Sequence, residues 1–106
     1  MIDLVKTAGD LGIGVDDLKM LLGEYFDPAR ELLVSLNEAI ALSDYKAVMM
    51  HAHSLKGVSA NMGVESICAF AAQIEDAGRK SDSATCLKLI GEAKVMLETE
   101  EKTVMV

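Results

Sequence analysis

The sequence predicts an all-α fold, an antiparallel up-down-up-down four-helix bundle with a short helical lead-in at its N-terminus. Aromatic residues make up only 4% of the chain, whereas Leu, Met and Ala are plentiful, a composition that favours helices over strands. Apolar residues recur at three- and four-residue spacing in several segments, and the two-residue alternation of half-buried strands is absent. Amphipathic helices with short connections pack most economically as one antiparallel bundle.

The chain of 106 residues has room for one domain. We divide it into a lead-in (1–14), a helical bundle (15–98) and a tail (99–106). Ten basic and seventeen acidic side chains give a net charge of −7, which disfavours binding to nucleic acid or anionic lipid and favours a neutral or basic protein partner. No stretch is apolar enough to span a membrane, charged residues interrupt the first ten positions where a signal peptide would be apolar, and no CxxC spacing surrounds Cys68 or Cys86. We therefore expect a cytoplasmic monomer that is not inserted in a membrane.

The first half of the bundle contains two helical segments. One begins at Val15, with acidic residues in its first turn, and Asp27-Pro28 is a good start for the next. The two segments are equally well explained as one kinked helix. Their apolar positions are Leu18, Leu21, Leu22, Tyr25 and Phe26, followed by Leu32, Leu33, Leu36, Ala39 and Ile40.

The second half contains three predicted helices. The first runs from Asp44 to Asn61, and Gly63 favours a left-handed stop behind it. The second has one apolar stripe and ends at Gly78 and the polar run 79–83; the third begins near Ser83 and frays into the tail. The apolar stripes are Ile67, Phe70, Ala71, Ile74 and Ala77 in the second helix and Leu87, Ile90, Val95 and Leu97 in the third.

The helix 44–61 carries both histidines of the chain on different faces. A rotation of about 100° per residue predicts a buried arc, and His53 falls nearly opposite to it. The arc consists of Val48, His51, Leu55, Val58, Ser59 and Met62, and the residues around His53 are Lys46, Met49, Met50, Lys56, Gly57 and Ala60. Because the two imidazoles diverge, they cannot chelate one metal ion, and we expect no metal site.

Gly57 and Lys56 distinguish the face of His53 from an ordinary solvated surface. A glycine inside a helix costs roughly 0.5–1 kcal/mol relative to alanine, and here it leaves space one turn after His53 for a close approach by a partner. Lys56 follows His53 by three residues, so its ammonium can reach an anion, such as a phosphate, attached to the imidazole. A close helix crossing explains Gly57 equally well, and a lone lysine is usually only solvated. Only the combination of the three residues raises the hypothesis of a phosphate-carrying histidine above these alternatives.

The run HAHSLKGVSANMG, from His51 to Gly63, resembles the signature of histidine-containing phosphotransfer (HPt) domains of bacterial phosphorelays. It has a histidine, a Lys-Gly pair three and four residues later, and a glycine ten residues later. The segment QIEDAGR on the following helix also fits the family's pattern. The resemblance extends from about Asp16 to Leu97, and outside the motif it depends on apolar pattern and helix order.

The resemblance implies a four-helix bundle whose exposed His53 accepts a phosphoryl group from one receiver-domain aspartate and passes it to another. Lys56 then lies near the phosphoryl group, and Glu75 accepts a hydrogen bond from Nδ1–H and leaves Nε2 as the nucleophile. Lys46, Met49, Met50, Gly57 and Ala60 would form the docking surface. Partners would be receiver domains and a sensor or hybrid histidine kinase.

Phosphoryl transfer also requires Mg²⁺, and the sequence places no carboxylate cluster beside His53 to bind it. We expect the receiver to supply the ion and this chain to bind no cofactor. Because a glycine-rich ATP loop is absent, the chain is predicted to be a carrier without kinase or phosphatase activity. Two alternatives remain, a phosphoacceptor domain of a chemotaxis-type kinase and a non-catalytic helical adaptor.

Overall fold

The computed structural model describes residues 1–105 and is entirely helical over that range. Its helices are α1 (Leu4–Leu11), α2 (Val15–Ala41), α3 (Tyr45–Asn61), α4 (Glu65–Arg79) and α5 (Ser83–Val104). No strand occurs among these residues. The predicted all-α class is therefore confirmed. None of the helices in residues 1–105 combines the length and apolar character needed to span a bilayer.

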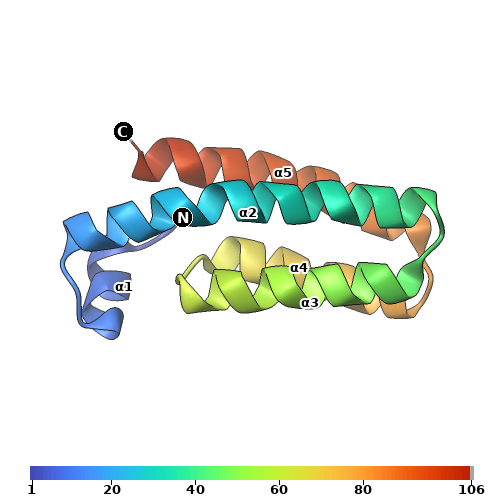
Figure 1. The fold of residues 1–106 in the computed structure, drawn as a ribbon, viewed down its shortest axis with the longest axis horizontal. Coiled ribbons are helices and arrows are strands. Elements are labelled where there is room, and N and C mark those ends of the chain that lie inside the picture. The colour runs from blue at the N-terminus through green and yellow to red at the C-terminus, as the bar shows by residue number, and fades with distance from the viewer. Residues whose placement is uncertain (106) are drawn as a thin grey trace.

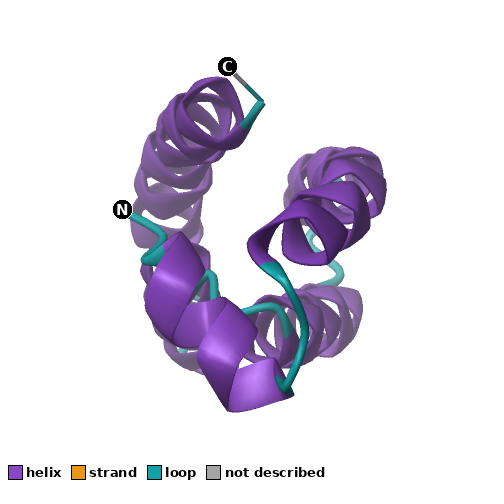
Figure 2. Cartoon of the chain, turned by 90° about the vertical axis from the view of Figure 1, so that its left-hand side faces the viewer, coloured by secondary structure: helices purple, strands orange, loops and turns teal. Residues whose placement is uncertain are grey.

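The four long helices surround one core. Each packs against two others: α2 contacts α3 and α5, and α4 contacts the same two helices. The chain reverses at each of the short turns after α2, α3 and α4 (Figure 1). Figure 2 looks along the helices and shows them around a common centre, with α1 at the near end. As a consequence α3 and α5 lie diagonally across the core and do not contact each other.

Apolar side chains from all five helices fill the core. The largest of those that are fully buried are Phe26, Leu18, Leu22, Leu36, Leu55, Ile67, Ile74, Ile90 and Leu97. One polar pair is included, because the Tyr25 hydroxyl lies 2.6 Å from the Ser59 hydroxyl. Burial raises the pKa of Tyr25 to about 12, so the phenol stays protonated and can donate to Ser59.

The ends of α3 follow the predicted signals. Asp44 caps its N-terminus by accepting a hydrogen bond from the Ala47 amide at 3.1 Å. Gly63 has a φ of 71°, the left-handed conformation expected at that position. A side chain there would also collide with Thr7 of α1, whose Cγ2 would be 2.6 Å from the added Cβ. Both the backbone conformation and the contact with Thr7 therefore require a glycine at this position.

The sequence left two alternatives around Pro28, and the structure has the single helix, because Pro28 lies inside one continuous α2. α4 ends at Arg79, one residue after the buried Gly78, where the sequence predicts its end. The predicted tail is wrong. α5 extends to Val104 and does not fray after position 98, because Glu100 and Val104 are both buried. Contacts of α5 with other helices override the polar pattern of this segment.

The buried face of α3 is also narrower than predicted. Val48, Leu55 and Ser59 are buried together with Ala52, whereas His51 and Met62 are half-buried and Val58 is 40% exposed. The predicted arc was rotated too far towards α2. Gly78 of α4 packs closely on Val48 and Met49 of α3, on the other side of this helix. On α5, Leu87 and Val95 are likewise exposed and do not belong to the core.

Candidate functional site

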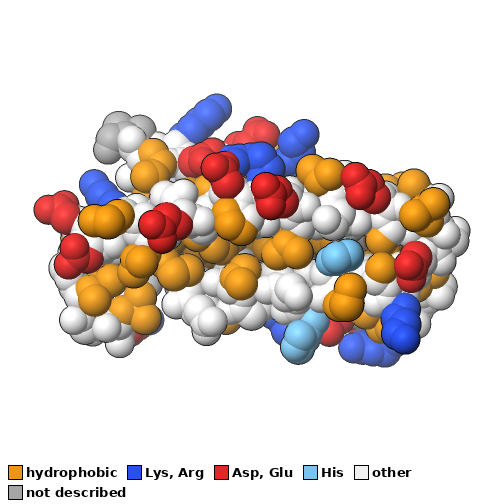
Figure 3. Space-filling model, in the orientation of Figure 1, with side chains coloured by type: hydrophobic (Ala, Val, Ile, Leu, Met, Phe, Trp, Pro, Cys, Tyr) orange, Lys and Arg blue, Asp and Glu red, His pale blue; other side chains and the backbone are white. Residues whose placement is uncertain are grey.

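His53 lies on the outer surface of α3, with 71% of its side chain exposed. Residues three, four and seven positions away on the same helix surround it, as helical spacing requires. Of these, Lys46, Met50, Gly57 and Ala60 are exposed, and Met49 is half-buried. Figure 3 shows both histidines at the surface of the face that includes α3. The imidazole is therefore accessible to another molecule.

Glu75 of α4 lies between His53 and Lys56. One carboxylate oxygen, Oε2, is 3.3 Å from His53 Nδ1, and the other, Oε1, accepts a hydrogen bond from Lys56 Nζ at 2.8 Å. Only 16% of the Glu75 side chain is exposed. A carboxylate at Nδ1 favours the tautomer with a proton on that nitrogen. The lone pair of Nε2 is then free to attack an electrophile.

The partner of the Lys56 ammonium differs from the one expected. The sequence places it towards an anion on the imidazole, whereas in the structure it pairs with Glu75. Its hydrogen bond is the main reason why the pKa of Glu75 lies below the ordinary 4.5, with a smaller contribution from the charge of His53. Glu75 therefore remains ionised in mildly acidic solution and keeps both neighbours in place.

The packing of α4 against α3 fixes the position of Glu75. Gly78, one turn further along α4, is so close to α3 that an added Cβ would lie 2.8 Å from Val48 Cγ1 and 3.6 Å from Met49 Cγ. Ile74 and Ala77 are buried beside it. With no side chain at Gly78 to separate the helices, the carboxylate can reach the face of α3 that carries His53.

His51 does not take part in this arrangement. It is half-buried two residues before His53, and it forms no ion pair within residues 1–105. In the same range no three or more His, Cys, Asp or Glu side chains are grouped to hold a metal ion.

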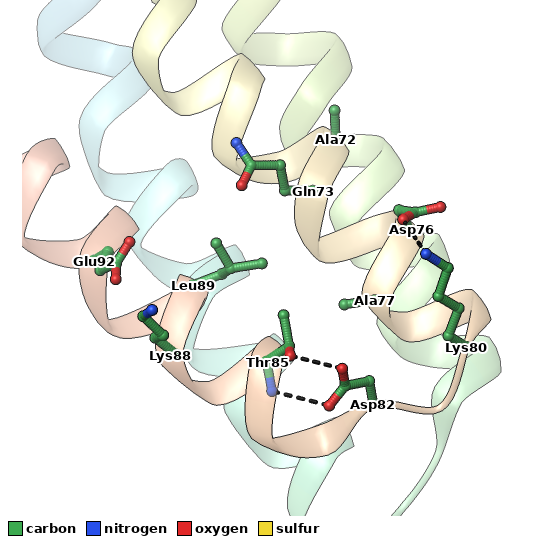
Figure 4. A pocket seen from close by; sticks show the side chains of 10 residues that line it. All are labelled: Ala72, Gln73, Asp76, Ala77, Lys80, Asp82, Thr85, Lys88, Leu89 and Glu92. Atoms are coloured by element: carbon green, nitrogen blue, oxygen red, sulfur yellow. Dashed lines mark hydrogen bonds and ion pairs between the residues drawn. The ribbon is translucent and has the colours of Figure 1, made fainter.

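A hollow at the junction of α4 and α5 contains none of the candidate site residues (Figure 4). Of its charged residues, Asp76 pairs with Lys80 at 3.1 Å, and Asp82 accepts hydrogen bonds from the amide and hydroxyl of Thr85. Lys88 and Glu92 also line it, and they form no ion pair within residues 1–105. The hollow contains no histidine, so His53 with Glu75 and Lys56 is the stronger candidate site.

An exposed imidazole held at one nitrogen by a carboxylate, on an all-helical domain, is suited to carry a group on its other nitrogen. The family model described as Hpt domain matches residues 20–102, most of the chain. The protein therefore belongs to the Hpt domain family, whose members have phosphotransfer roles in two-component signalling. No curated protein and no solved structure matches the chain.

The ion pair in the site leads to a first prediction. Replacing Lys56 with Met removes the main cause of the low Glu75 pKa, so that pKa should rise, since burial opposes ionisation. His53→Gln should raise it less. Carbon-13 NMR titration of the Glu75 carboxyl group measures both. Equal shifts in the two variants would contradict the assignment of Lys56 as the stronger partner.

The same shift determines a pH dependence of folding. Because the pKa of Glu75 is lower in the folded than in the unfolded chain, its ionised form stabilises the fold above the unfolded value near 4.5. This stabilisation is lost as the pH falls through the lower folded value. Lys56→Met should reduce the loss, which urea denaturation at pH 3 and pH 7 would measure.

Proposed function

We propose that this protein relays a phosphoryl group between receiver-domain aspartates through phospho-His53. The observation that supports this most is the position of Glu75 Oε2, 3.3 Å from His53 Nδ1, behind an imidazole that is 71% exposed. The chain acts as a carrier and has no kinase or phosphatase activity of its own. The scaffold is the antiparallel up-down-up-down four-helix bundle expected from the sequence, an arrangement that the ring of contacts among α2, α3, α4 and α5 supports.

In the proposed step, His53 Nε2 attacks the phosphorus of a phosphoaspartate. The P–N bond forms, the P–O bond to the aspartate breaks, and the receiver's carboxylate leaves. The ring keeps its proton on Nδ1 and gains a positive charge, which the ionised Glu75 stabilises from the inner side. Transfer to the second receiver reverses these bond changes. Glu75 thus needs no proton exchange during the reaction.

Two cations would neutralise negative charge on the phosphoryl oxygens. Lys56 follows His53 by three residues, and a hydrogen bond to Glu75 holds its ammonium near the imidazole. The flexible side chain of Lys56 allows the ammonium to turn towards a phosphoryl group on Nε2. Mg²⁺ would be bound by the receiver's acidic pocket and would neutralise charge on the group in transfer. This chain supplies the nucleophile and a single cation.

Docking of the receiver would use the surface around His53. Lys46, Met50, Gly57 and Ala60 are exposed there, and the half-buried Met49 lies at its edge next to Gly78. Met and small side chains adapt to a partner, and the glycine allows its loops close access to the imidazole. A shallow apolar hollow between α2 and α3, lined by Tyr25, Pro28, Val58 and other residues, would extend this surface.

The test is to incubate the purified protein with receiver domains phosphorylated on aspartate, in the presence of Mg²⁺. We expect at least one receiver to lose its phosphoryl group while an acid-labile phosphohistidine appears on this chain. Phosphorylation only by an ATP-bound kinase domain, and by no receiver, would instead establish the chemotaxis-type alternative. Docking of receivers without any labelling would establish the adaptor.

The docking surface can be tested separately from the chemistry at Gly57. A Cβ added there meets nothing within 4 Å, so Gly57→Ala should stabilise the helix by about 0.5–1 kcal/mol. Gly57→Leu should also fold, but its side chain should obstruct the receiver and slow transfer at least about tenfold. Urea denaturation and transfer rates measure the two effects. An unchanged transfer rate in folded Gly57→Leu would contradict the proposed docking surface.

A further inference from the structure

Lys46 is a cation on the same face of α3 as His53. It precedes His53 by seven residues, two helical turns, so the two side chains project from one side of the helix. Lys46 is exposed and forms no ion pair within residues 1–105. Its charge can therefore act on a molecule that approaches His53.

Arg79 brings another cation to this face from α4. It follows Glu75 by four residues, so it lies on the same side of α4, towards α3. A Cβ on Gly78, the residue before it, would lie 3.6 Å from Met49 Cγ. Arg79 is therefore beside the turn of α3 that precedes His53. Its side chain is 61% exposed and accessible to a partner.

Lys80 follows Arg79 directly but lies on a different side of α4. One residue rotates the side chain by about 100°, and Lys80 lines the hollow between α4 and α5 (Figure 4). Asp76 lies between the two cations, with one carboxylate oxygen 3.1 Å from Arg79 Nη1 and the other 3.1 Å from Lys80 Nζ. Because one carboxylate balances two cations, positive charge remains at this end of α4.

The positive charge near His53 contrasts with the protein as a whole, whose net charge is −7. Three cations surround His53, namely Lys46, Lys56 and Arg79, and the acidic Glu75 beside them is already paired with Lys56. A partner with an acidic surface would be repelled by the chain overall and attracted at this face. The charge distribution therefore favours one orientation of such a partner.

We infer that Lys46 and Arg79 attract the acidic rim of a receiver's phosphorylation pocket and orient it over His53. The inference rests on the proposed function, because a pocket that holds Mg²⁺ beside an aspartate is itself built from carboxylates. The exposed Met50 and Gly57 lie closer to the imidazole than these cations do along α3, as in interfaces with an apolar centre and a polar rim. Charges at a rim determine orientation and association rate.

This role differs from that of Lys56. The Lys56 ammonium is held 2.8 Å from Glu75 Oε1, beside the imidazole. Lys46 is two turns of α3 away from His53, and Arg79 is one turn of α4 beyond Glu75. These two cations are therefore placed to contact the receiver, and we expect them to affect its association and not the chemistry at Nε2.

Isothermal titration calorimetry of the full chain with the receiver domains of the transfer assay tests the inference. Measurements at about 0.05 M and about 0.5 M salt compare weak with strong screening. Lys46→Gln and Arg79→Gln should each weaken binding about two- to fivefold at low salt, the range of exposed ion pairs. At high salt both variants should bind like the wild type. Circular dichroism should show that both remain helical.

Lys80→Gln is the matched control for Arg79→Gln. It removes the same charge from the neighbouring residue and from the same partner, Asp76, but on the side of α4 that faces α5. Its affinity for the receiver should stay close to that of the wild type. Equal weakening by the two substitutions would mean that only net charge matters and would overturn the inference. Wild-type binding that does not change with salt would overturn it as well.

Phosphoryl transfer measured in parallel separates this inference from the proposed function. Receivers that dock through Lys46 and Arg79 but never label His53 would contradict the relay and support the inference. A double variant, Lys46→Gln with Arg79→Gln, that binds receivers and accepts phosphoryl groups from them at low salt as well as the wild type would contradict the inference and leave the relay intact.

Discussion

Replacing His53 with Gln is expected to abolish phosphorylation of this chain by a phosphorylated receiver. Gln has no ring nitrogen that can attack phosphorus, and no other histidine lies next to Glu75 among residues 1–105. The fold should be retained, because the side chain is 71% exposed and supports no core contact. Transfer assays combined with urea denaturation would show an inactive protein of nearly unchanged stability.

His51→Gln is the matched control for this experiment. His51 is two residues away and half-buried, and it has no carboxylate partner within residues 1–105. The variant should therefore transfer at close to the wild-type rate. If His51→Gln abolishes labelling and His53→Gln does not, the assignment of the two faces of α3 is wrong.

Gly78→Val is expected to produce the largest loss of stability among the glycine substitutions in the helices. The added Cβ would lie 2.8 Å from Cγ1 of buried Val48, a branched side chain that has little freedom to move. Overpacking of this kind costs about 1–3 kcal/mol, and it can be relieved only by moving α4 away from α3. Since that movement would also take Glu75 away from His53, transfer should decline together with stability.

Gly57→Val on α3 provides the comparison, because no atom lies within 4 Å of a Cβ at that position. A urea midpoint that falls in Gly78→Val and stays near wild type in Gly57→Val would support the close helix contact. Equal midpoints in the two variants would contradict it. The slope of the transition should stay constant if only the native packing has changed.

The features of the site that are local in sequence were predictable. Asp44 caps α3 by accepting a hydrogen bond from the amide of Ala47, three positions later. Gly63 favours the end of the helix because its own backbone is in the left-handed conformation. The exposure of His53 follows from helical spacing alone. Glu75 was predicted as a site residue only from the family resemblance. In the structure its carboxylate lies 3.3 Å from His53 Nδ1. Its contact with Lys56 joins two helices across 19 positions, and no local pattern encodes it.

The features that the local pattern left open or mispredicted depend on tertiary contacts. Pro28 has the local pattern of a helix start and fits a single helix equally well. α2 continues through it because residues on both sides, Phe26 and Ala29, are fully buried. The polar end of the chain has the pattern of a tail, yet Glu100 and Val104 are each 1% exposed and extend α5. Gly78 lies at the predicted end of α4, and the sequence did not reveal that its lack of a side chain also allows close packing on α3.

The most direct test of the account is to locate the phosphorus on the protein after transfer from a receiver. Long-range proton–nitrogen NMR of the nitrogen-15-labelled protein, with phosphorus coupling, distinguishes both the residue and the ring nitrogen. The account predicts phosphorus on Nε2 of His53 and a proton on Nδ1, next to Glu75. Phosphorus on His51, or on Nδ1 of His53, would contradict it.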